Sequence, residues 1–156
     1  MQKVYKVLAW IIAAEVAIQA AAMVFAISGL FIWVDRDGGV LDKAALESED
    51  LFPELIGFMI HGINGMMVIP ALALILFIVS FFARIPGGTR WAGVLLLAVI
   101  AQVLLGMFGH GASLSGLLHG VNALVLFTVA LYAGWRVNRL TVETPPVRAE
   151  REAGRV

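Results

Sequence analysis

Two histidines in a repeated local sequence are the residues of this chain best suited to chemistry. Residues 61–65 read HGING and residues 119–123 read HGVNA, so each histidine is followed by a glycine and, two residues later, by an asparagine. Imidazole nitrogens bind metals, and two of them on opposite faces of a porphyrin hold a six-coordinate haem iron. The repeat therefore predicts one haem b, with His61 and His119 as its axial metal ligands.

The neighbours of both histidines fit a flat cofactor. Gly62, Gly65 and Gly120 are small enough to let a macrocycle approach the helix backbone, although small residues also serve close helix packing. Asn64 and Asn122 follow their histidines by three residues and lie on roughly the same helix face. We expect them to hydrogen-bond a haem propionate or the ligand imidazole of the other helix.

A few further polar residues lie in apolar stretches, where they usually face the interior of a helix bundle. We expect Gln19 and Gln102 near mid-membrane, bonded across the bundle or lining the haem cavity. His110 is expected beside the propionates rather than on the iron. Glu15 shares a helix face with Gln19 and is interpreted as a carboxyl that docks the first helix, or alternatively as a proton-accepting site.

Other interpretations of the two histidines remain open. Duplication alone could copy a structural contact in which the histidine only joins two helices. The histidines could also bind another metal or a transported ion. Zinc usually takes three or four protein ligands, and His110 could supply the third.

The elements that must position these residues are membrane-spanning helices. Of the 156 residues, 61% are hydrophobic and 14% charged, against about 25% charged in soluble domains. About 20 apolar residues in a helix cross a bilayer. The composition predicts an all-α integral membrane four-helix bundle, up-down-up-down, within residues 1–140. Its helices are expected at residues 8–33, 55–82, 91–110 and 114–135.

Charge is distributed unevenly along the chain. The loop at 35–54 holds seven acidic residues against two basic ones, whereas the other helix ends carry lysine and arginine. Basic short loops stay in the cytoplasm. We therefore expect a multi-pass protein of the bacterial inner (cytoplasmic) membrane, with both termini and a flexible tail at 141–156 inside. The acidic loop would lie outside, with a short helix near 41–46.

The four helices form two parallel repeats. Helices 1 and 3 share a glutamine followed six residues later by phenylalanine, and helices 2 and 4 share the histidine string. We call helices 1 and 2 pair A, and helices 3 and 4 pair B. Diagonal partners in such a bundle face each other across the interior. Each histidine lies about 8–9 Å into its helix, so the two should be level in the outer half of the membrane.

The sequence also resembles a known family. A mid-helix glutamine in AQVLLG at 101–106, followed by LHGVNA at 118–123, is similar to the helix pairs of haem A synthase. That family is built of two four-helix halves, each gripping a haem between histidines of its second and fourth helices. The resemblance covers residues 10–134 and implies one such half with a bis-histidine haem. The glutamate that shortly precedes the first histidine in the catalytic half is missing, so haem hydroxylation is not implied.

These features together predict a small membrane b-type cytochrome rather than an enzyme, used in electron transfer or haem handling. The expected partners are the lipid bilayer and either quinol or an extracytoplasmic redox protein. One alternative is a haem-free accessory or assembly subunit of a larger membrane complex or homo-oligomer, and another is a small transporter. Nothing predicts nucleic-acid binding, and the absence of cysteine excludes thiolate sites.

Overall fold

The protein was analysed as a computed structural model that describes residues 1–48, 51–109 and 111–142. The described residues form helices and connecting turns, with no β-strand among them. The elements are α1 (Gln2–Arg36), α2 (Lys43–Leu46), the 3-10 turn η1 (Pro53–Leu55), α3 (Ile56–Ile63), the π-helical segment η2 (Asn64–Val68), α4 (Ile69–Ala83), α5 (Gly88–Gly109) and α6 (Ser113–Val142).

Four continuous helical segments are long and apolar enough to cross a bilayer, which confirms the predicted number. They are Gln2–Arg36, Pro53–Ala83, Gly88–Gly109 and Ser113–Arg139. Most of their large apolar side chains face outward, where a soluble protein would place polar groups. The chain is therefore an all-α, multi-pass membrane protein.

The first and last helices are longer than their apolar stretches. α1 begins at Gln2 rather than at residue 8, and α6 continues to Val142 rather than ending at residue 135. Lysine and arginine are good helix formers, so charge ends the hydrocarbon span without ending the helix. The short helix expected near 41–46 forms over Lys43–Leu46, where the Asp42 side chain accepts a 2.8 Å hydrogen bond from the Ala45 amide.

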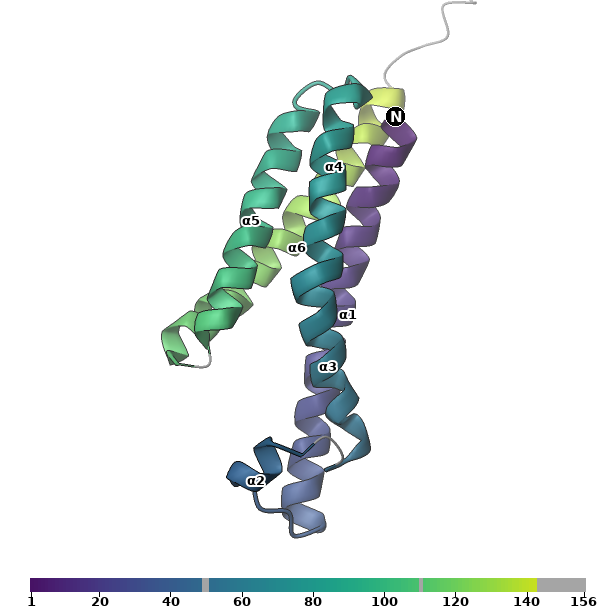
Figure 1. The fold of residues 1–156 in the computed structure, drawn as a ribbon. Coiled ribbons are helices and arrows are strands. Elements are labelled where there is room, and N and C mark those ends of the chain that lie inside the picture. The colour runs from purple at the N-terminus through teal and green to yellow at the C-terminus, as the bar shows by residue number, and fades with distance from the viewer. Residues whose placement is uncertain (49–50, 110, 143–156) are drawn as a thin grey trace, which may run out of the picture.

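The helices are arranged as an antiparallel bundle in which sequential neighbours are also spatial neighbours (Figure 1). α1 packs against α6 and against α3 and α4, while α5 packs against α4 and α6. The α3–α4 helix and α6 are therefore diagonal partners, as predicted for the two helices that carry the histidines. The N-terminus, the α4–α5 turn and the described end of α6 lie at one end of the bundle, which we call the terminal end.

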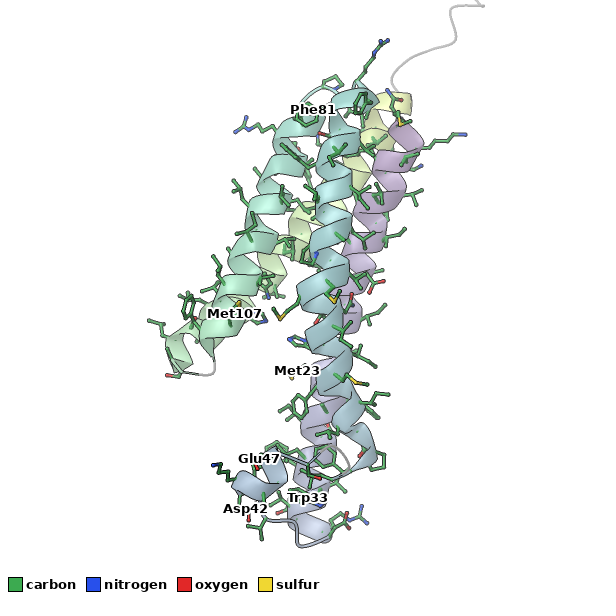
Figure 2. The ribbon with its side chains drawn as sticks, viewed as in Figure 1. Met23, Trp33, Asp42, Glu47, Phe81 and Met107 are labelled. Carbon is green, nitrogen blue, oxygen red and sulfur yellow. The ribbon has the colours of Figure 1, made fainter. Side chains whose placement is uncertain are left out.

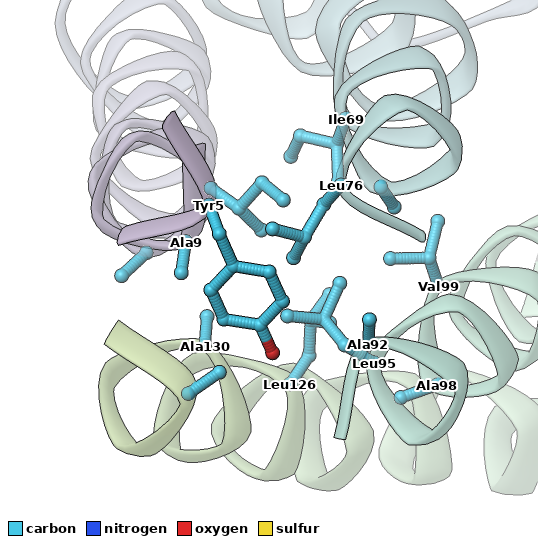
Figure 3. Packing of buried hydrophobic residues seen from close by; sticks show 14 of the residues in the cluster. Tyr5, Ala9, Ile69, Leu76, Ala92, Leu95, Ala98, Val99, Leu126 and Ala130 are labelled. Carbon is cyan, nitrogen blue, oxygen red and sulfur yellow. The ribbon is translucent and has the colours of Figure 1, made fainter. Parts of the chain in front are cut away.

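The hydrophobic core occupies only the part of the bundle near the terminal end. All four long helices contribute to it, including the fully buried Leu76 of α4, Leu95 of α5 and Leu126 of α6 (Figure 3). Tyr5 enters from α1, and its hydroxyl donates a 3.0 Å hydrogen bond to the Gly88 carbonyl. Beyond the core, α5 and the first part of α6 lean away from α1 and α3 (Figure 1).

The second spanning helix contains a π-helical turn at η2. Pro70 follows this turn, and its ring has no N–H and clashes with the carbonyl four residues earlier, at Met66. A wider turn relieves that clash. The offset that relates His61 to His119 relates Pro70 to Thr128, whose hydroxyl instead donates 2.8 Å to the Leu124 carbonyl in an uninterrupted helix. Proline thus makes pair A locally irregular where pair B is regular.

The position of the core predicts which leucines of α4 stabilise the bundle. Leu76→Ala should lower the free energy of unfolding by about 2–5 kcal/mol, because it leaves a cavity among the four helices. Leu74→Ala is the matched control, since that side chain is 50% exposed on the same helix. Unfolding experiments in mixed detergent micelles measure the free energy of unfolding of both variants. Equal losses would contradict the assigned core.

Candidate functional site

A cavity of about 620 Å³ lies between pair A (α1, α3, α4) and pair B (α5, α6), directly beyond the core. One core residue from each long helix also lines the cavity and forms its floor: Val16, Ile69, Val99 and Leu126. Met23 of α1 and Met107 of α5 line it further out, on opposite sides of the space between the pairs (Figure 2). The cavity exists because the pairs diverge where the core ends.

His61 of α3 and His119 of α6 face each other across this cavity. Their ring centroids are 6.0 Å apart, and the ring planes are inclined at 60°. Both side chains are half-buried and both line the cavity. The structure therefore brings together the two residues that the repeat singled out, from diagonal helices.

The His119 ring is held by hydrogen bonds at both nitrogens. Its Nδ1 lies 3.0 Å from the main-chain carbonyl oxygen of Gln102, and its Nε2 lies 3.1 Å from Nε2 of the same glutamine. A carbonyl only accepts and an amide nitrogen only donates. His119 is thus a neutral imidazole with its proton on Nδ1 and its lone pair on Nε2.

Asn122 fixes the orientation of the glutamine amide. Its Nδ2 donates 2.6 Å to Gln102 Oε1 and 2.9 Å to the Ala98 carbonyl. Since Gln102 Oε1 accepts from Asn122, its Nε2 must be the atom that faces His119. Pair B therefore satisfies its own polar groups through one closed chain of hydrogen bonds.

Pair A repeats the first contact but not the rest. His61 Nδ1 lies 3.4 Å from the main-chain carbonyl of Gln19, which corresponds to Gln102 in the repeat. Gln19 is only 7% exposed and lines the cavity, yet neither polar atom of its side chain has a hydrogen-bond partner among the described residues. An unpaired buried amide is costly, so this side chain is the least satisfied polar group at the site.

Asn64 does not hydrogen-bond Gln19 as Asn122 hydrogen-bonds Gln102, because Glu15 of α1 presents a carboxylate to it. Its Nδ2 donates 2.8 Å to Glu15 Oε2, and its Oδ1 is buried without a partner. The residue of pair B that corresponds to Glu15 is Ala98, which has no side-chain acceptor. Neither asparagine hydrogen-bonds a histidine within the described residues. Both instead connect the two helices of their own pair.

The glycines next to the histidines leave open space in the cavity. A Cβ added at Gly62 or Gly120 would meet no atom within 4 Å, and both residues line the cavity. Gly65 differs, because a Cβ there would lie 3.0 Å from the Gln19 amide. A Cβ at Gly106 would lie 3.0 Å from the His119 ring, so this glycine makes room for the imidazole. We did not single out Gly106 from the sequence, although its spacing of four from Gln102 places both on one helix face.

The described residues offer two imidazoles to a metal, and no third histidine, cysteine or carboxylate side chain joins them. Within residues 1–48, 51–109 and 111–142, no three histidine, cysteine, aspartate or glutamate side chains gather as a metal site would require. His110 lies outside the described residues. Two opposed imidazoles beside an apolar cavity suit an axial pair on a cofactor better than a bare metal ion.

No protein-family model, curated protein or solved structure matches this chain.

The two glutamines predict opposite effects of one substitution. Gln102→Leu should lower the free energy of unfolding by about 1–2 kcal/mol, because it leaves Asn122 and His119 without partners. Gln19→Leu should cost nothing or stabilise the protein, since it removes two unpaired buried atoms. Unfolding of the haem-free protein in mixed micelles compares the two, and equal destabilisation would refute the assigned network.

Proposed function

We propose that this chain is a small membrane b-type cytochrome whose single haem b is held by His61 and His119. The observation that carries the proposal is the opposition of the two rings, with centroids 6.0 Å apart across an apolar cavity. A metal–nitrogen bond is about 2 Å long, and a ring nitrogen lies about 1 Å from its centroid, so two opposed ligands place their centroids about 6 Å apart. The separation matches that arrangement.

The hydrogen bonds at Nδ1 support the same assignment. Metal-bound histidines commonly donate their second N–H to a main-chain carbonyl or a carboxylate, which fixes the tautomer and the ring orientation. Here each Nδ1 lies beside the main-chain carbonyl of a glutamine on the preceding helix. Both Nε2 atoms are then the nitrogens available to a metal. Gln102 must withdraw its amide from His119 Nε2 before that atom can bind iron.

The cavity fits a flat apolar group. Its volume of about 620 Å³ is within the usual range for sites that enclose small molecules and cofactors. Gly62 and Gly120 leave free the space that a Cβ would fill on either side. The floor residues separate the site from the terminal end of the bundle and exclude water from that direction.

A haem with two axial histidines supplies reversible one-electron transfer and has no open coordination position for a substrate. The chain's own residues would orient the imidazoles, fix the tautomer of His119 and provide an apolar surrounding. Electron transfer or haem handling is therefore the use we propose, with a quinol or an extracytoplasmic redox protein as partner. The resemblance of residues 10–134 to one half of haem A synthase supports this assignment.

One observation favours a second candidate, a haem-free accessory subunit of a larger membrane complex. The polar groups of Gln102, His119 and Asn122 satisfy one another without any ligand. Joining α5 and α6 would be a sufficient role for such a closed network, with no ligand required. The unpaired Gln19 amide and the open space at Gly62 and Gly120 are what this alternative leaves unexplained.

Visible spectroscopy distinguishes these candidates. Protein expressed with ample haem and purified in mild detergent should give a low-spin b-type spectrum on reduction with dithionite. His61→Ala and His119→Ala should each abolish the low-spin form, because each removes one axial ligand. His110→Ala is the control and should retain it. A folded but colourless wild-type protein would overturn the proposal in favour of the accessory subunit.

A variant that fills the cavity tests haem binding without touching a ligand. Gly120→Leu places its side chain in open space, so the fold should persist while haem binding falls at least tenfold. Ala130→Gly, within the core and away from the site, is a matched control for a change on the same helix. Unchanged haem content in Gly120→Leu would contradict the assigned cavity.

The distribution of charge gives a proposed orientation, with the termini in the cytoplasm and the acidic loop outside. Because the chain has no cysteine, single cysteines can report each side. Val40→Cys, which is 69% exposed, should react with an impermeant maleimide in intact cells, whereas Gln2→Cys should react only after the membrane is opened. The reverse labelling pattern would show that the protein has the opposite orientation in the membrane.

A further inference from the structure

The two histidines are held with unequal strength, although they occupy equivalent positions in the repeat. His119 has hydrogen bonds of 3.0 and 3.1 Å at its two nitrogens. His61 has one hydrogen-bond contact within the described residues, and at 3.4 Å it is longer than an ordinary N–H···O bond. The free energy required to turn His61 away from the cavity is therefore smaller than for His119.

Two sequence differences between the pairs account for this inequality. Glu15 stands where pair B has Ala98, and it draws Asn64 away from Gln19. Pro70 stands where pair B has Thr128, and the π-helical turn before it begins three residues after His61. π-helical turns are frequently found at functional sites, and the turn here interrupts the regular hydrogen-bond pattern of the helix that bears His61. The helix segment that carries His61 is thus the more adjustable of the two.

The same differences leave a free amide on the His61 side of the cavity. In pair B the glutamine amide lies 3.1 Å from the imidazole nitrogen that would bind iron. In pair A the Gln19 Nε2 instead lies against Gly65, where an added Cβ would be 3.0 Å from it. Gln19 is 7% exposed, and among the described residues its side-chain donor and acceptor both lack a partner. This unpaired amide is about one helical turn from His61 and is the side-chain group on that side of the cavity that can turn to hydrogen-bond a small molecule.

We infer that His61 is an exchangeable ligand and that this side of the site binds a neutral diatomic molecule, to which the Gln19 amide donates a hydrogen bond. This inference rests on the proposed haem. With haem bound, the diatomic would take the place of the His61 imidazole, so one bond would be exchanged for another with no electron transferred. His119 would be retained, because the Gln102 main-chain carbonyl accepts a hydrogen bond from its Nδ1. The adjustable segment at η2 lets His61 move without unfolding the bundle.

Carbon monoxide is the probe for this exchange. Added to the dithionite-reduced, haem-loaded protein, it should convert the low-spin spectrum to that of a carbon monoxide complex. Gln19→Leu should move the C–O stretching band to higher wavenumber, because the hydrogen bond to the bound molecule is lost. The same variant should weaken carbon monoxide binding by up to about tenfold. Gln2→Leu, the same substitution at the exposed start of α1, is the matched control and should leave the band in place.

Glu15→Ala tests the cause of the asymmetry. Without the carboxylate, Asn64 is free to bond Gln19 as Asn122 bonds Gln102, so the C–O band should shift in the same direction as in Gln19→Leu. A low-spin haem spectrum that carbon monoxide leaves unchanged would overturn this inference while the proposed cytochrome stands. A band that responds to Gln102→Leu and not to Gln19→Leu would place the exchange at His119 and also overturn it. If the protein binds no haem, both the proposed cytochrome and the exchange at His61 are wrong.

Discussion

The site depends on a hydrogen bond between an imidazole Nδ1 and a main-chain carbonyl of the neighbouring helix. A histidine inside the hydrocarbon region is costly unless it is paired, and few side chains are available there as acceptors. A helical carbonyl already bonded to its own helix keeps a second lone pair, so it can accept from His119 without opening α5. This single contact sets the tautomer, places the opposite nitrogen beside the Gln102 amide and requires a glycine, Gly106, where the ring lies against α5.

This contact occurs in both helix pairs, but the surroundings of the two histidines differ. Pair B closes its polar groups into one chain that ends on the Ala98 carbonyl. Pair A diverts its asparagine to Glu15 and carries Pro70 in the helix that bears its histidine. The result is one rigid and one adjustable side around a common cavity. The unpaired Gln19 amide is the energetic consequence of that division, and it is the kind of local cost that proteins keep at functional positions.

The sequence was sufficient for those features that follow from hydropathy and from the repeat. Uncharged stretches gave the number of helices, and the two HGxN strings indicated the pair of histidines that meet in the structure. Helix ends were less predictable, because lysine and arginine end a membrane span but not a helix. The π-helical turn could have been inferred from Pro70, since the missing N–H and the clash lie within one turn of that residue.

The partners of the polar side chains were beyond sequence reasoning. Asn64 and Asn122 occupy equivalent positions, yet one bonds a carboxylate and the other an amide and a carbonyl. Which acceptor lies nearest depends on how two helices cross, and spacing along one helix does not determine that. The residues that form the cavity floor could not be predicted from the sequence for the same reason. Val16 and Val99 look like any other apolar residues until four helices bring them together.

The separation of core and cavity along the bundle has a consequence for biogenesis. Every fully buried large side chain lies toward the terminal end, where the four helices are in contact without any ligand. Insertion into the membrane and association of the helices can therefore be completed there first, in the newly made polypeptide. The opposite end keeps its cavity without any ligand, so the proposed haem could be added after the helices have associated. On that proposal, the cofactor would be the last component to enter the bundle.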